Sequence, residues 1–193
     1  MFGNLNFQLG KVNPSGIGST IYRIRKSDIV SWPTIANDPD ASPAPAVKDL
    51  SVYKGDFVLK TGKYFDKIYS TQGKGSISSE PIGETDCMMF NNNGVFSFPD
   101  LTPEALAFVK SAVNDDYVYI VPAAGRYHII GSPDYRCKTS APSNSGDEPG
   151  SAKGVTINVT CPDVTPLPLY EGDIVLSDGT LDAADGSFTA SNG

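Results

Sequence analysis

The residues that could do acid–base chemistry are few, and they are widely separated in the sequence. His128 is the only histidine. It falls in the middle of a predicted β-hairpin, where we expect a packed or partly exposed neutral side chain rather than a catalytic base. A Cys–His pair stays open, because spacing along the chain does not reveal proximity in space. The chain contains no G-x-S-x-G motif, so no local pattern indicates nucleophilic catalysis.

The three cysteines, Cys87, Cys137 and Cys161, form an odd and widely spaced set without a C-x-x-C motif. Such a set is typical of reduced thiols in a protein made in a cytosol. The first residues lack the basic start and apolar stretch of a signal peptide. We therefore expect no disulfide.

Several short motifs resemble ligand sites but lack essential positions. Gly73-Lys74-Gly75-Ser76 lacks the first glycine and the spacing of a phosphate-binding loop. Asp38-Pro39-Asp40 begins like a calcium loop without the central glycine or the closing glutamate. Glu80, Glu84 and Asp86 flank a predicted loop, and nothing in the sequence places them in one buried site. We expect no catalytic residue, no cofactor and no bound metal.

Length and composition favour one domain with long loops and tails. The chain has 193 residues, a hydrophobic fraction of 39% and a net charge of −7. This charge opposes binding to a phosphate backbone, since no basic block offsets it. No apolar run approaches the roughly 18–20 residues that a membrane span requires.

The chain is organised around a predicted hairpin at 117–130. Tyr117–Val121 and Arg126–Ile130 are rich in β-branched and aromatic residues, and the turn composition of Pro122–Gly125 separates them. An isolated two-stranded ribbon is marginally stable in water, so the rest of the chain must supply more sheet. Further strands are predicted at Thr20–Lys26, at Asp56–Lys60 and Lys63–Thr71 joined through a tight Thr61-Gly62 turn, at Val95–Phe98 after an Asn91–Gly94 turn, at Val155–Thr160 and at Asp173–Leu176. Gly73–Pro81 either extends this sheet or forms a second loop.

One helix is predicted, from Pro103 to about Asn114. Thr102 has the side chain of an N-cap, and proline suits the first helical position. Leu101 and Leu106 have the spacing of a hydrophobic staple. Leu106, Val109 and Val113 form one apolar stripe, so we expect this side of the helix to lie against a sheet.

Three segments have no apolar periodicity that would bury them. They are an arm at 1–18, a proline-rich loop at 31–47 and a small, acidic tail at 177–193, and the single β domain spans 19–176. Ordering backbone costs about 1–2 kcal/mol per residue, so we expect a neighbouring subunit to hold these segments. Trp32 is either a local anchor or a contact to that partner.

The order of these elements resembles the major tail tube proteins of long-tailed bacteriophages, particularly those of Bacteroidetes phages. The resemblance rests on Gly75–Gly83, Gly125–Ser132, Gly154–Val159 and Pro168–Gly172, and it covers about residues 20–176. It implies a β-sandwich flanked by a helix, hexameric rings whose sheets join into a barrel around a lumen, and no catalytic residues. Loops and termini would then bridge stacked rings.

The sequence thus predicts a mainly β protein, a two-sheet sandwich or partial barrel with one flanking α-helix, long loops and extended termini. We expect a virion tail protein that assembles in the host cytoplasm. Its partners would be itself, other tail proteins such as tape measure and terminator, and DNA passing through the lumen. The alternative is a carbohydrate- or receptor-binding sandwich or head decoration module, for which Tyr53, Tyr64, Tyr69 and Trp32 are the candidate aromatics. Candidate subunit-interface residues are Phe2, Phe7, Trp32, Pro33, Asp38, Pro43, Pro45, Lys74 and Ser76.

Overall fold

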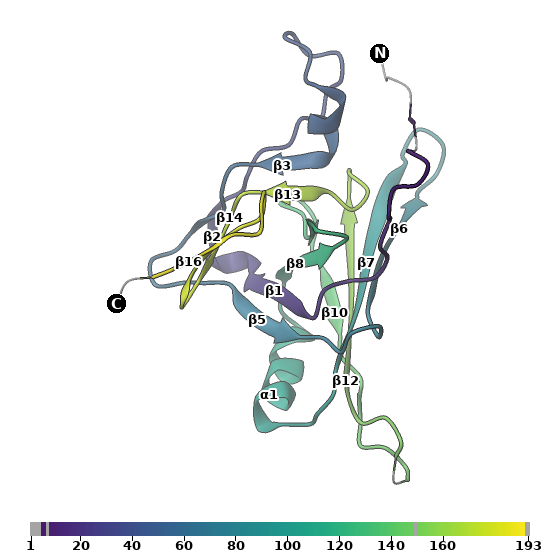
Figure 1. Ribbon diagram of the computed structural model, residues 1–193, viewed down its shortest axis with the longest axis vertical. Coiled ribbons are helices and arrows are strands. Elements are labelled where there is room, and N and C mark those ends of the chain that lie inside the picture. The colour runs from purple at the N-terminus through teal and green to yellow at the C-terminus, as the bar shows by residue number, and fades with distance from the viewer. Residues whose placement is uncertain (1–4, 7, 149, 192–193) are drawn as a thin grey trace.

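A computed structural model describes residues 5–6, 8–148 and 150–191. The molecule is mainly β, with 43% of residues in strands and 10% in helices. Its single α-helix lies beside the sheets (Figure 1). The fold class predicted from the sequence is confirmed.

Two sheets form the sandwich. The first, called here the central sheet, has six strands in the order β3-β13-β9-β8-β1-β5. All its pairings are antiparallel except that of β13 with β3. Its strands are β1 (Thr20–Arg25), β3 (Val52–Lys54), β5 (Asp66–Tyr69), β8 (Tyr117–Ala123), β9 (Arg126–Ile130) and β13 (Leu169–Glu171).

The second sheet, called here the outer sheet, has the order β10-β12-β7-β6, and β11 also pairs with β12. Its strands are β6 (Ser76–Ile82), β7 (Met89–Phe98), β10 (Lys138–Ser140), β11 (Ser143–Asn144) and β12 (Gly154–Asp163). The long β7 and β12 are paired over nine positions, from Val155 opposite Phe98 to Asp163 opposite Phe90.

Smaller elements complete the chain. A three-stranded sheet contains β14 (Asp173–Leu176), β15 (Gly179–Asp182) and β16 (Phe188–Ala190), and β2 (Ile29–Ser31) pairs with β4 (Val58–Leu59). The helices are α1 (Pro103–Ala112) and the 3-10 turns η1 (Lys26–Asp28) and η2 (Val47–Ser51).

The predicted central hairpin is confirmed, and both of its faces are buried. In β8, Tyr117, Tyr119 and Val121 contact the core beneath the outer sheet. Val118 and Ile120 contact a second core, which the three-stranded sheet and the loop after β2 cover. Two buried faces require apolar residues at every position, as β8 has. The sandwich is therefore extended by a third layer, which the sequence analysis does not anticipate.

Two of the strand predictions need correction, and one open alternative is resolved. Asn91–Gly94 is not a turn but the middle of β7, because β6 and β12 pair with it on both sides. β4 and β5 do not form a hairpin, since β4 pairs with β2 and β5 with β1, although Gly62 does occupy the turn between them at φ 73°. Of the two alternatives for Gly73–Pro81, the structure has the strand, β6, which joins the outer sheet beside β7.

The tail contributes strands and core rather than only polar chain. β15 pairs with both β14 and β16, and Leu181 and Ala183 are buried in the second core. Two apolar residues among many acidic and small ones are too few to produce a visible pattern.

The helix begins as predicted, but it packs on a different side. The Thr102 hydroxyl accepts a hydrogen bond from the Ala105 amide at 3.2 Å. Ala105, Phe108, Val109 and Ala112 pack on the core. Leu106 and Val113 are 44% and 55% exposed. Of the predicted stripe, only Val109 packs on the core as expected, and the predicted burial of Leu106 and Val113 and the staple at Leu106 are wrong.

The expectation of three reduced thiols is also wrong. A disulfide joins Cys137 to Cys161 in the core beneath the outer sheet, and Cys87 is free and exposed. The pairing of β10 with β12 places Lys138 opposite Thr160, which makes the two cysteines cross-strand neighbours. Spacing alone does not reveal such a neighbourhood.

Candidate assembly surfaces

The outer sheet has one face on the core and one covered mainly by polar side chains, most of them Ser, Thr and Asn. Residues alternate between the two faces along each strand, and the burial of β7 and β12 alternates accordingly. By this alternation the outward set is Ser76, Ser78, Glu80, Ile82, Met89, Asn91, Asn93, Val95, Ser97, Lys138, Ser140, Asn144, Thr156, Asn158, Thr160 and Pro162, with Ile82 and Met89 together at one end of the β6–β7 pair. Lys138 and Glu80 are its only ionisable members.

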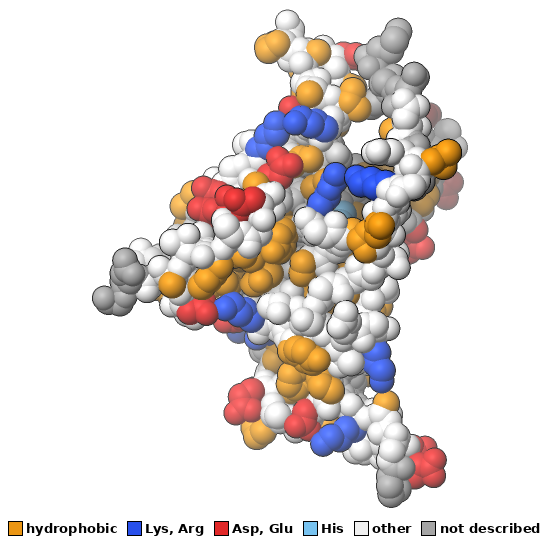
Figure 2. Space-filling model, viewed as in Figure 1, with side chains coloured by type: hydrophobic (Ala, Val, Ile, Leu, Met, Phe, Trp, Pro, Cys, Tyr) orange, Lys and Arg blue, Asp and Glu red, His pale blue; other side chains and the backbone are white. Residues whose placement is uncertain are grey.

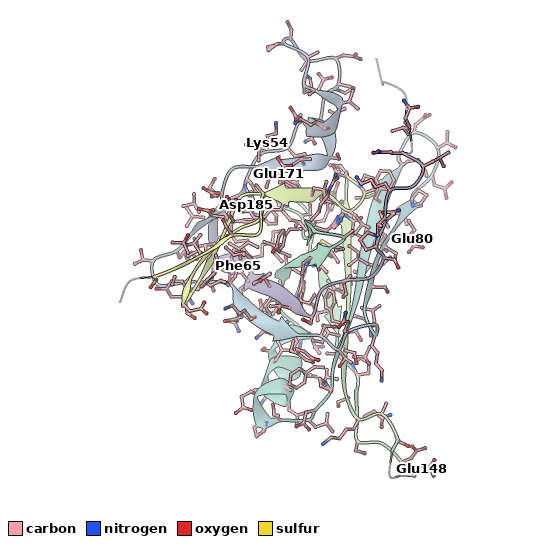
Figure 3. All side chains as sticks on the ribbon, viewed as in Figure 1. Lys54, Phe65, Glu80, Glu148, Glu171 and Asp185 are labelled. Carbon is pink, nitrogen blue, oxygen red and sulfur yellow. A yellow bond between two sulfur atoms is a disulfide. The ribbon has the colours of Figure 1, made fainter. Side chains whose placement is uncertain are left out.

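A row of hydrogen bonds crosses this face. The Thr160 hydroxyl donates to the side-chain oxygen Oδ1 of Asn93 at 2.9 Å. The side-chain Nδ2 of Asn93 in turn donates to the Glu80 carboxylate at 3.3 Å. Glu80 lies on β6, at the side of the molecule (Figure 3). The row fixes these side chains across three strands, so the face is ordered without being apolar.

Both edges of the outer sheet lack a further paired strand within the described residues. β6 presents seven residues, and the other edge is divided between the short β10 and β11. Pro81 sits in β6, as proline does on edge strands where its missing N–H faces outward. A free edge is a template for pairing with another chain.

The loop after β2 projects from one end of the body (Figure 1). Trp32 is partly buried and packs edge-on against Phe57, with ring centroids 5.2 Å apart. This geometry favours the local-anchor interpretation of Trp32. Pro33 is buried, whereas Asp38 and Pro43 are exposed and Pro45 is partly exposed.

The remaining interface candidates lie elsewhere. Lys74 and Ser76 are exposed at the start of β6, far along the chain from the loop. Phe2 and Phe7 fall outside the described residues. The structure therefore does not bring the predicted interface residues together into one surface. Exposed hydrophobic side chains are visible on the projecting end of the molecule (Figure 2).

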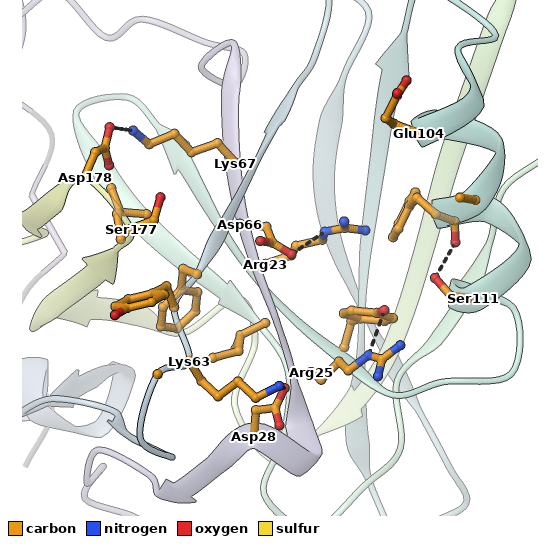
Figure 4. A pocket seen from close by; sticks show the side chains of 18 residues that line it. Arg23, Arg25, Asp28, Lys63, Asp66, Lys67, Glu104, Ser111, Ser177 and Asp178 are labelled. Carbon is orange, nitrogen blue, oxygen red and sulfur yellow. Dashed lines mark hydrogen bonds and ion pairs between the residues drawn. The ribbon is translucent and has the colours of Figure 1, made fainter.

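A groove of about 820 Å³ opens between β5, α1 and the end of β14 (Figure 4). Each of its four cations lies beside a carboxylate: Lys67 with Asp178 at 2.7 Å, Lys63 with Asp28 at 3.4 Å, Arg25 with Asp115 at 2.9 Å and Arg23 with Asp66 at 3.6 Å. The groove is thus close to electrically balanced.

Arg23 is the unusual member of this groove. Its guanidinium lies 3.8 Å from the centre of the Phe108 ring, and its Nε and Nη1 atoms are buried without a hydrogen-bond partner. Burial lowers the pKa of Arg23, and the nearby Asp66 carboxylate opposes this shift. Cation–π contact with Phe108 and Tyr117 offsets part of the desolvation cost. Sequence reasoning missed Arg23, because an arginine in a strand gives no sign of burial.

Two titratable side chains lie away from the groove: His128, which the sequence singled out, and Asp163, which it did not. His128 is partly buried, and its Nδ1 lies 2.9 Å from the Leu167 carbonyl oxygen. Asp163 is buried, and burial, with a smaller contribution from Asp134, raises its pKa to about 6. Neither lines the groove beside β5.

Asn92 is a second residue that sequence reasoning missed. Its side chain is buried and connects three segments: it accepts from the Ser79 hydroxyl and the Leu167 amide, and it donates to the Thr165 carbonyl. A run of asparagines followed by glycine has the composition of a turn, which conceals a buried asparagine.

Comparison with known proteins gives no relative. No family model, no curated protein and no solved structure matches the chain. Among the described residues, no group of three or more His, Cys, Asp or Glu side chains is placed to hold a metal ion. No helix in this part of the chain is long and apolar enough to cross a membrane.

Proposed function

We propose that this protein is a structural subunit that assembles with copies of itself, and specifically that it forms the tail tube of a long-tailed bacteriophage. The observation that carries the proposal is the outer sheet, which combines an ordered, nearly uncharged polar face with two edges open to further strands. Joining β6 of one copy to the β10–β11 side of the next would satisfy both edges.

The polar face suits the inside of such a tube. Hydroxyl and amide side chains hold water, and with Glu80 and Lys138 as the only ionisable groups the face offers few charges to bind DNA phosphates. DNA would pass over it without being held.

The proposal places the protein in the virion tail, assembled in the host cytoplasm, with tape measure and terminator proteins as further partners. It assigns no catalytic residue and no cofactor. The resemblance in the order of elements and the mainly β fold support it.

The alternative function, carbohydrate or receptor binding, depends on a cluster of exposed aromatics. Of its four candidates, Tyr53 is buried and Trp32 packs on Phe57. Tyr64 and Tyr69 are exposed, at 47% and 51%. Two exposed tyrosines do not favour this function over assembly.

Negative-stain electron microscopy of the concentrated full-length protein tests the proposal, with light scattering to follow size. We expect rings or tubes. A protein that stays monomeric at every concentration and pH tried would contradict both the assembly and the tail-tube assignment. Dispersed particles that bind to a glycan array would instead support the alternative.

A further inference from the structure

The strand β5 at the edge of the central sheet has open hydrogen-bonding positions. The Ser70 amide donates to the carbonyl of Ser19, the residue just before β1. Along an antiparallel pair, the backbone N–H and C=O groups of successive residues point alternately towards the partner strand and away from it. Those of Ile68 and Asp66 therefore also face β1, whereas those of Lys67 and Tyr69 face away from it. The next outward-facing amides on either side of Lys67 and Tyr69 already have partners. The Phe65 amide donates to the Val175 carbonyl, and the Thr71 amide donates to the Ser97 carbonyl. The open stretch is therefore short and bounded at both ends.

Cavities lie beside this open stretch. The large groove adjoins Lys67, and a smaller cavity of about 160 Å³ adjoins both Ile68 and Tyr69. The smaller cavity is lined by apolar side chains of the outer sheet and helix, among them Phe98, Ala105, Phe108, Val155 and Ile157. An added strand would thus find backbone partners along β5 and an apolar recess on one side of it.

The arm, to which we assigned no apolar periodicity as a whole, does alternate over five residues, and these have no strand partner in their own subunit. Leu5, Phe7 and Leu9 alternate with Asn6 and Gln8, which is the period of a strand with one apolar face. Leu5 and Leu9 are 104% and 89% exposed. Phe7 lies outside the described residues, and its contribution here is only its position in the sequence. An apolar face this exposed is a liability unless another surface covers it.

The arm and the open stretch match in length, in polarity and in charge. The stretch between the bonded Phe65 and Thr71, residues 66–70, is as long as the segment from Leu5 to Leu9. The alternating apolar side chains would enter the recess beside Phe98 and Phe108, and the amides would face Lys67. The first acidic residue of the chain is Asp28, so the arm carries only the positive charge of Lys11. Glu104, which lines both cavities, has no ion-pair partner among the described residues.

The arm emerges from its subunit at a point remote from the β5 of the same subunit. Ile17 forms a bridge with Ala123, at the end of β8 on the other side of β1, and the Gly18 amide donates to Pro122. In Figure 1 the arm then runs towards the upper end of β6, while β5 and α1 lie at the opposite side of the body. This placement favours an acceptor in another copy.

We propose that the arm segment from Leu5 to Leu9 of one copy binds as an added strand along the open edge of β5 in a second copy, with its leucines in the recess beneath α1. Strand addition supplies affinity through main-chain hydrogen bonds and specificity through alternate side chains. The inference rests on the self-assembly proposed above, and it identifies one contact by which copies would be joined.

Two pairs of full-length variants test this contact. The donor variant combines Leu5→Ser with Leu9→Ser, and its matched control combines Asn6→Ser with Gln8→Ser on the polar face. The acceptor variant is Lys67→Pro, which removes an outward N–H and leaves the hydrogen bonds to β1 in place. Its matched control is Lys67→Gln, which loses the same ion pair with Asp178 but keeps the N–H. Circular dichroism establishes that each variant is folded.

Hydrogen–deuterium exchange with mass spectrometry then reads the β5 segment directly. In the natural chain and both controls, exchange at residues 66–69 should slow by about tenfold or more as the protein is concentrated, because the covered edge opens only on dissociation. Each defective variant alone should show no such slowing. Mixing the donor variant with the acceptor variant should restore protection to β5 of the donor variant only, and the proline makes the two β5 peptides distinguishable by mass.

The possible failures separate the two proposals. Assemblies in which β5 still exchanges rapidly would overturn the arm contact and leave the assembly proposal standing. Protection that is equally strong in the dilute monomer would mean that the arm closes its own edge, which also overturns the contact. A chain that never associates would overturn both proposals.

Discussion

At the scale of single residues, buried polar side chains hold the connections between layers. Asn92 fixes the loop from Val164 to Leu167 against β7, and His128 contacts the same loop through the Leu167 carbonyl. Leu167 has a positive φ of 42°, an unusual conformation for a leucine. These side-chain contacts therefore stabilise a backbone path that the local sequence does not favour.

Asn92→Ala should lower the free energy of unfolding by about 3 kcal/mol, because it leaves a buried carbonyl, hydroxyl and amide without their partner. Urea denaturation of dilute protein measures the loss. Asn93→Ala is the matched control, since Asn93 lies on the outer face and should cost less than about 1 kcal/mol. Equal losses in the two variants would contradict the role assigned to Asn92.

Asp163 should make stability depend on pH. Its Oδ1 accepts from the Val164 amide at 2.7 Å, and its Oδ2 is buried without a partner. Burial raises the folded-state pKa of Asp163 to about 6 from its ordinary value of 3.8. The folded state thus holds the proton more tightly than the unfolded chain does. The stabilising effect is complete below about pH 4, declines as the pH rises through 6, and is absent at higher pH.

Asp163→Asn should therefore raise the free energy of unfolding at pH 8 by about 2 kcal/mol and flatten its change between pH 5 and pH 8. Denaturation of both proteins at the two pH values gives the comparison. Burial also raises the pKa of Asp173, so the difference between variant and natural slopes, rather than either slope alone, is the informative quantity. A variant that keeps the full natural slope would show that Asp163 is ionised in the folded protein.

At the scale of elements, α1 shows how a correct boundary can accompany an incorrect orientation. The cap at Thr102 depends on local chemistry, and sequence predicts it. Which side of the helix is buried depends on the neighbouring strands, and here Phe108 turns towards Arg23 and Tyr117. The stripe of Leu106 and Val113 is left partly exposed.

Phe108→Ala should destabilise the protein by about 3 kcal/mol through lost packing and the exposed Arg23 guanidinium. Thr102→Ala should cost about 1 kcal/mol through the lost cap. Leu106→Ala, in contrast, should change stability by less than about 1 kcal/mol because its side chain is partly exposed. Thermal or urea unfolding of the three variants ranks them. A larger loss for Leu106 than for Phe108 would mean that the helix packs through the opposite side.

The tip of the projecting loop after β2 can be deleted without disturbing its base. Thr34 pairs with Lys54, and the Ala36 amide donates to Asp49, so the loop is tied down at its base. Replacing 38–44 with a short glycine bridge should leave the fold intact and prevent rings from stacking. Circular dichroism tests folding and electron microscopy tests tube length. Tubes of normal length from this variant would show that the loop takes no part in the stacking of rings.

At the scale of the whole molecule, local patterns predicted the elements better than their partners. Both strands of the central hairpin, β1, β12 and β14 follow from composition and alternation. The layer formed with Leu181 and Ala183, the disulfide between Cys137 and Cys161, and the pairing of β5 with β1 depend on contacts between distant segments. For the same reason, the proposed site at β5 could not be found from sequence. The arm was predicted to have no apolar periodicity, because the alternation of Leu5, Phe7 and Leu9 is short and becomes meaningful only beside an edge that fits it.

The separation of the arm from the open edge of β5 gives the proposed contact a direction. Each copy would carry a donor at one side and an acceptor at another, so a row of copies would end in unused arms at one extremity and in vacant edges at the other. Such a polymer is polar, and its two ends are chemically different. Where the contact joins stacked rings, growth continues along the stack, because a head-to-tail contact stops by itself only when the rotation between copies closes it into a ring. A different protein would have to cap each end, and only one type of cap would fit each.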